Sequence, residues 1–148
     1  MIRPEKDFVL RTKQIIEASA SKYEVSLLIN CSFGLVVFPY AMLLEDLGVS
    51  GRGWWSNYPF WKRNLKDFDN LPLVLRTCLA QNAFPKTIGE LFYKLRNTLC
   101  HNRFEPINTD QKLIGIALIF KEGFSVEFKK DELREVLIFV ADVYLEYS

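Results

Sequence analysis

The stretch Val25–Leu44 constrains the fold most, because it runs for twenty residues without a formal charge. That length of apolar helix would cross a lipid bilayer. Asn30 and Pro39 interrupt the stretch, and no basic cluster flanks one end of it. We interpret Val25–Leu44 as a buried central helix that Pro39 kinks or ends, with a membrane anchor as the alternative.

The overall composition fits a single globular domain over residues 1–148, with 49% hydrophobic and 25% charged residues. The net charge is +1, so any affinity for nucleic acid has to come from a local patch. The three cysteines are widely spaced, which favours reduced thiols over a disulfide framework or a zinc site. The charged residues Arg3, Glu5, Lys6 and Asp7 come soon after Met1, so we expect no secretory signal and a cytoplasmic protein.

Apolar periodicity predicts the remaining elements. Two apolar runs joined by Lys121–Gly123 predict a β-hairpin with a glycine for positive φ. Asp131 can cap a final helix that carries an apolar stripe. The predicted helices cover Lys6–Ala20, Val25–Leu44, Leu73–Gln81, Ile88–Phe104 and the segment after Asp131; the predicted strands are Leu113–Phe120 and Phe124–Phe128.

The segment Gly48–Asn70 contains three glycines and all three tryptophans of the chain, with arginines and lysines between them. Aromatic faces beside cations can stack on unpaired bases, so a nucleic-acid-binding loop at Trp54–Lys66 is one interpretation. The other is a loop that packs its aromatic side chains onto the protein. We favour the second interpretation.

The segment Ile88–Phe104 holds the only histidine of the chain, His101. A helical projection places Glu90, Lys94, Asn97 and His101 opposite the apolar stripe, with Arg96 on a flank. Arg96 and His101 are then about 140° apart, so they converge only if the helix ends near His101 or Arg96 reaches round. Asn97 and His101 share a face, where an amide can orient an imidazole.

Several kinds of catalytic site are excluded by the residues that are missing. One histidine cannot build a multi-histidine metal site, and the chain has neither a G-x-S-x-G motif nor a glycine loop for phosphates, so we expect no metal and no cofactor. Arg96 and His101 remain. A guanidinium binds phosphate oxygens and an imidazole transfers protons, which suffices for metal-free RNA cleavage if a second copy supplies the other acid or base.

The segment Arg96-Asn97-Thr98-Leu99-Cys100-His101 resembles the R-x4-6-H motif of the HEPN superfamily, with a polar residue directly after the arginine. The longer sequence LRNTLCHNRFEP is similar to the corresponding segment of small single-domain bacterial HEPN proteins. The residues around Tyr23–Val25, Leu28–Asn30 and Gly34–Pro39 resemble the second helix of that branch. The resemblance covers two segments, about a quarter of the chain.

This resemblance implies a mainly α fold, an up-and-down helical bundle into which the hairpin is inserted before the C-terminal helix. It also implies a homodimer whose motif helices meet at a shared cleft. Family members often cleave RNA without metal in defence, toxin–antitoxin or RNA-processing roles. One toxin branch is silenced at a tyrosine two residues after the histidine, where this chain has Arg103, so that control is not expected here.

The resulting hypothesis is a dimeric HEPN endoribonuclease. His101 is the general acid or base, Arg96 stabilises the phosphorane, Asn97 orients His101, and Asn102 and Arg103 contact the RNA backbone. The expected partners are RNA, a second copy of the chain and an antitoxin or other protein, with no membrane. The alternative is a non-catalytic HEPN-like module that binds RNA or another protein.

Overall fold

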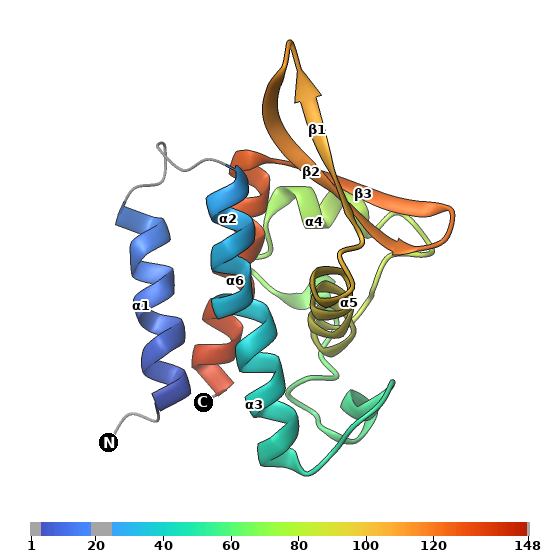
Figure 1. The fold of residues 1–148 in the computed structure, drawn as a ribbon. Coiled ribbons are helices and arrows are strands. Elements are labelled where there is room, and N and C mark those ends of the chain that lie inside the picture. Colours follow the sequence, from blue (N-terminus) through green and yellow to red (C-terminus); the bar gives the residue numbers. More distant parts are fainter. Residues whose placement is uncertain (1–3, 19–24, 148) are drawn as a thin grey trace.

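The computed structural model describes residues 4–18 and 25–147. Helices α1, α2, α3 and α6 run roughly alongside one another, a small sheet lies at one end of them, and α5 is seen end-on (Figure 1). The end of the expected first helix at Ala20 and the motif residues Tyr23 and Glu24 lie outside the described residues. The helices are α1 (Pro4–Ala18), α2 (Val25–Ser32), α3 (Phe38–Leu47), α4 (Leu73–Cys78), α5 (Ile88–Cys100) and α6 (Lys130–Tyr147); the strands are β1 (Phe104–Thr109), β2 (Lys112–Lys121) and β3 (Phe124–Lys129).

The uncharged stretch forms one continuous helical path from α2 to α3. A π-helical segment, η1 (Phe33–Val37), joins the two, and the Phe38 N–H donates to the Phe33 carbonyl. Pro39 then falls in the first turn of α3, where its missing N–H is tolerated. Leu27–Leu47 is long and apolar enough to cross a membrane, with a mean hydropathy of 2.0, and 39% of its most apolar window is buried. In this fold it packs against α1, α5 and α6.

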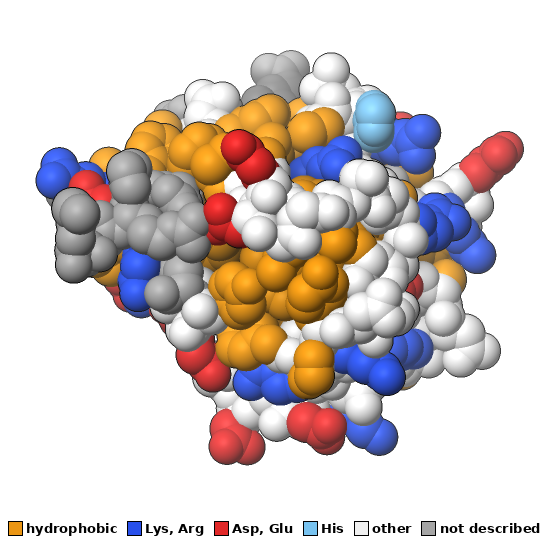
Figure 2. Space-filling view, turned by 90° about the horizontal axis from the view of Figure 1, so that it is seen from below, with side chains coloured by type: hydrophobic (Ala, Val, Ile, Leu, Met, Phe, Trp, Pro, Cys, Tyr) orange, Lys and Arg blue, Asp and Glu red, His pale blue; other side chains and the backbone are white. Residues whose placement is uncertain are grey.

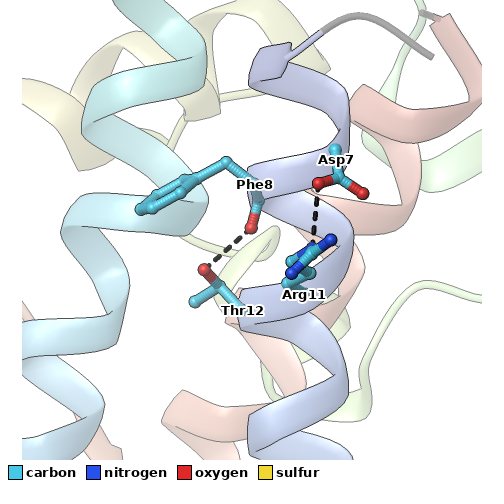
Figure 3. A network of polar contacts seen from close by, with 4 residues as sticks. All are labelled: Asp7, Phe8, Arg11 and Thr12. Carbon is cyan, nitrogen blue, oxygen red and sulfur yellow. Dashed lines mark hydrogen bonds and ion pairs between the residues drawn. The ribbon is translucent and has the colours of Figure 1, made fainter.

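Helix α1 approaches the α2–α3 path closely at Gly34. A Cβ at Gly34 would lie 2.9 Å from the ring of Phe8, so a side chain there would push α1 away. The Phe8 ring points toward this path and meets Phe38 edge-on, 5.3 Å between centroids (Figure 3). Within α1, Asp7 pairs with Arg11 Nε at 2.8 Å, and the Thr12 hydroxyl donates to the Phe8 carbonyl (Figure 3).

The expected up-and-down bundle with an inserted hairpin is wrong. The sheet has three antiparallel strands in the order β1-β2-β3, and α5 crosses the other long helices instead of running alongside them (Figure 1). The extra strand, β1, contains Pro106, which has no N–H to donate to a strand partner. Pro106 is tolerated because β1 is an edge strand. Asp110 and Gln111 connect β1 to β2 with φ of 51° and 65°, as a type I′ turn requires.

The tryptophan-rich segment packs onto the protein, which confirms the interpretation favoured above. Trp54 and Trp61 are 5% and 1% exposed. The Trp61 ring stacks on Phe92 of α5, 5.5 Å between centroids. The Gly89 N–H donates to the Trp61 carbonyl at 2.8 Å, and a Cβ at Gly89 would lie 2.4 Å from Cβ of Trp55. This segment therefore holds the first turn of α5 in place.

Candidate functional site

Helix α5 begins where its sequence signal predicts. Thr87 is the N-cap, and its hydroxyl accepts a hydrogen bond from the Glu90 N–H at 3.2 Å. The buried side of α5 faces the core through Ile88, Leu91, Phe92, Leu95, Thr98 and Leu99. The opposite side is left for the polar residues of the motif.

Helix α5 ends at His101, which is its C-cap. Asn102 follows with φ of 53°, the Arg103 N–H donates to the Thr98 carbonyl at 2.8 Å, and the Asn102 N–H donates to Leu99 at 3.4 Å. This is the Schellman arrangement, in which an asparagine or glycine takes the left-handed position. The conformation of Asn102 therefore ends the helix and turns the chain toward β1.

Substitutions at Asn102 can distinguish a structural role of this residue from a role in RNA binding. We expect Asn102→Gly to keep the full melting temperature, because glycine adopts positive φ without strain. Asn102→Val should cost about 1–2 kcal/mol, because a branched side chain is strained there. Thermal denaturation checks both values. RNA affinity that falls in the glycine variant would show that the Asn102 side chain also contacts RNA.

Arg96 lies half-buried on the flank of α5 that faces α3. Its guanidinium carbon is 4.9 Å from the centre of the Tyr40 ring, a cation–π geometry. The Tyr40 hydroxyl accepts a hydrogen bond from Trp54 Nε1 at 2.8 Å. Burial raises the pKa of Tyr40, opposed by the Trp54 hydrogen bond and the charge of Arg96. The planar face of Arg96 is thus held against an aromatic ring, and the nitrogens at its edge can donate to an anion.

His101 is exposed at the end of α5. Figure 2 shows the histidine, in pale blue, at the surface beside lysine and arginine side chains. In the described part of the chain, no hydrogen bond, ion pair or ring contact joins His101 to Arg96. Within one protomer the structure therefore presents the two motif residues on the same end of α5 without bringing them into contact.

Asn97 contacts Tyr93, one turn earlier on α5. Burial would raise the pKa of Tyr93, but hydrogen bonds from Asn97 and Arg52 and the charges of Arg52 and Lys94 outweigh it, so the pKa is lowered. The Arg52 guanidinium carbon lies 5.8 Å from the centre of the Tyr93 ring. Tyr93 thereby links Asn97 of the motif to an arginine from the loop after α3.

A small cavity of about 160 Å³ brings together two predicted site residues, Asn97 and Arg103. Arg52, Lys94 and Lys121 also line it, and the sequence alone does not predict these three residues as part of a site. Lys94 faces outward by helical periodicity, so its sequence position could have indicated it. Arg52 and Lys121 reach the cavity only through the packing of a loop and the register of a hairpin.

The described residues contain no group of three or more histidine, cysteine or acidic side chains placed to hold a metal ion. All three cysteines are free thiols. Burial raises the pKa of Cys31 and Cys78, whereas Cys100 is exposed beside His101. The functional groups at and around the motif are therefore the imidazole of His101, the amide of Asn97, and the cationic side chains of arginines and lysines, namely Arg52, Arg96, Arg103, Lys94 and Lys121.

Comparison with known proteins gives one informative result. No curated protein and no solved structure matches the chain. A family model described as HEPN pEK499 p136 matches residues 2–148, nearly the whole chain and not only the motif. The chain therefore belongs to the HEPN pEK499 p136 family.

Proposed function

We propose that this protein is a metal-independent endoribonuclease that acts as a cytoplasmic homodimer in defence, toxin–antitoxin or RNA processing. The observation that carries the proposal is the exposed His101 at the end of α5, beside lysine and arginine side chains (Figure 2), with Arg96 half-buried on the flank of the same helix. Membership of a HEPN family supports a role on RNA. The burial of Trp54 and Trp61 speaks against the alternative in which their loop stacks on bases.

The residues of the motif can perform cleavage in one displacement. The imidazole of His101 accepts the proton of a ribose 2′-hydroxyl as its oxygen attacks the adjacent phosphorus. Arg96 donates to the phosphoryl oxygens while negative charge accumulates on them. The bond from phosphorus to the 5′-oxygen breaks, and that oxygen takes a proton from His101 of the partner subunit. The products are a 2′,3′-cyclic phosphate and a 5′-hydroxyl, and solvent restores both imidazoles.

The geometry of one protomer gives the reason for a dimer. A single imidazole cannot accept and donate the two protons at once, and the chain has one histidine. Arg96 is held toward Tyr40, whereas His101 lies at the exposed helix end. Two copies that meet through these faces of α5 would place the arginine of one chain near the histidine of the other.

Mixed dimers test this arrangement. Arg96→Ala and His101→Ala subunits should each be inactive alone in EDTA. When wild-type and His101→Ala subunits are refolded together in equal amounts, each mixed dimer holds one imidazole and cannot both accept and donate a proton, so activity should fall to about a quarter of that of the same total amount of wild-type protein. The measurement is the cleavage rate of a labelled single-stranded RNA, with product ends identified by mass spectrometry.

The outcomes distinguish a catalytic site shared by two chains from a non-catalytic module and from a site within one chain. RNA that is bound but not cut by the wild-type protein would favour the non-catalytic module. Activity that falls only to half, in proportion to the wild-type subunits, would contradict a site shared between two chains. Cys100 provides an independent check of the interface, because it is exposed next to His101. A short bismaleimide should link two copies of the wild-type chain, and Cys100→Ser should remove that link.

A further inference from the structure

The cavity beside α5 is a second feature of the motif surface, distinct from the Arg96–His101 pair. It lies between the outward side of α5, the loop after α3 and the turn between β2 and β3. Asn97 and Lys94 line it from α5, Arg52 from the loop, and Lys121 from the end of β2. Its volume of about 160 Å³ is well below the range of pockets that hold whole cofactors, so it suits one small group.

Positive charge is concentrated at this cavity. Four cationic side chains line it, Arg52, Lys94, Arg103 and Lys121, against one carboxylate, Glu122. In the part of the chain that the structure describes, the ion pairs involve other residues and none of these four. The whole chain carries a net charge of only +1, so this group is a local excess. An anion in the cavity would relieve the repulsion among the four cations.

The cationic groups are held by neighbouring structure. Lys94 Nζ donates to the carbonyl of Phe120 at 3.4 Å, which directs it toward the end of β2. Arg52 contacts the ring and the hydroxyl of Tyr93. The backbone of Arg103, the residue before β1, is held because its carbonyl accepts from the Ile119 N–H at 2.9 Å. Groups that are placed before a ligand arrives bind it at a smaller entropic cost.

We propose that this cavity is a subsite for a backbone phosphate of the RNA strand, next to the phosphate that is cleaved. The inference rests on the proposed function, because it assigns a path to the substrate of that site. Asn97 lines the cavity, and His101 follows it by four residues on the same side of α5, so their Cβ atoms are about 5–6 Å apart. A strand that reaches His101 therefore passes the cavity. Guanidinium and amide donors match phosphodiester oxygens.

Binding experiments test the subsite without relying on catalysis. In a His101→Ala background, Arg52→Ala/Lys121→Ala should weaken binding of labelled single-stranded RNA about tenfold or more. The slope of log K against log salt should fall by about 0.7, the value for one phosphate contact on a single strand. Lys62→Ala/Lys66→Ala is the matched control, since it removes two exposed charges from the tryptophan-rich segment. The control should change affinity by less than about twofold. Equal losses in the two pairs, or no loss in the first, would overturn the assignment.

Kinetics separate failure of the subsite from failure of the enzyme hypothesis. With the active protein, Arg52→Ala/Lys121→Ala should raise KM for an oligonucleotide and leave a dinucleoside monophosphate unaffected, because the latter has only the phosphate that is cut. An equal rise in KM for both substrates would overturn the phosphate subsite and leave the enzyme hypothesis standing. If the wild type binds RNA through Arg52 and Lys121 but does not cleave it, the enzyme hypothesis is overturned and the phosphate subsite stands.

Inorganic phosphate identifies the source of the anion. If inorganic phosphate raises the melting temperature of the wild type but not of Arg52→Ala/Lys121→Ala, the cavity binds phosphate chemistry. The same result with RNA affinity unchanged in that variant would make it a site for a free anion and would overturn the RNA assignment.

Discussion

His101→Ala is expected to lower the rate of RNA cleavage in EDTA by about 10²–10⁴-fold, the usual contribution of a general acid or base. The dimer would lose both imidazoles at once, so the lower end of that range is a minimum. Fold and dimer should survive, because the His101 side chain is exposed and only its backbone N–H closes the helix, by donating to Asn97 at 3.0 Å. Initial rates on a labelled RNA give the value.

Two further variants show whether the loss of cleavage rate in His101→Ala is specific to the reacting groups. Cys100→Ser changes the exposed neighbour of His101 and should leave the rate within about twofold of wild type, because surface substitutions away from the reacting groups have small effects. Arg96→Lys keeps the charge but loses the planar fork, so its rate should fall between those of wild type and Arg96→Ala. Cleavage that survives in His101→Ala would remove the histidine from the mechanism, whatever the other variants do.

Local signals predicted the start of α5 but not its end. Thr87 and Glu90 identify the N-terminus, and the apolar stripe identifies the buried side. The helix stops at His101 and not at Phe104, because Asn102 takes the left-handed conformation that an isolated sequence does not reveal. The residues that follow form β1, whose edge position accommodates Pro106. Its partner β2 supplies the pairing that decides its conformation.

The candidate site likewise contains residues that the sequence predicts and residues that only the structure reveals. Asn97 and Arg103 were predicted from the motif, and the structure brings them to one cavity. Arg52 and Lys121 come from segments that are far apart in the sequence, so only tertiary packing reveals that they share this cavity. The contact of Arg96 with Tyr40 was equally hidden, because it depends on how α5 crosses α3. Side chains that belong to one helix were predictable, whereas groups assembled from several elements were not.

The second large effect is expected at Trp61, whose replacement by alanine should cost about 3–5 kcal/mol of the free energy of unfolding. Its ring is 1% exposed and packs against Phe92, Tyr147 and Trp54 at 5.5, 5.2 and 6.1 Å between centroids. The melting temperature should fall by about 6–20 °C, since 1 kcal/mol shifts a domain of this size by about 2–4 °C. A scan by circular dichroism measures it.

Trp61→Phe is the control that isolates packing from polarity. The buried Trp61 Nε1 has no hydrogen-bond partner in the described structure, so phenylalanine removes a costly unpaired donor while it keeps a ring against Phe92. The cost of Trp61→Phe should therefore be less than half that of Trp61→Ala. A Trp61→Ala protein that melts like the wild type but loses RNA affinity would instead mean that Trp61 stacks on RNA. The loop would then be a nucleic-acid interface, and the position of α5 would have to be supported by other contacts, such as the hydrogen bond from the Gly89 N–H to the Trp61 carbonyl.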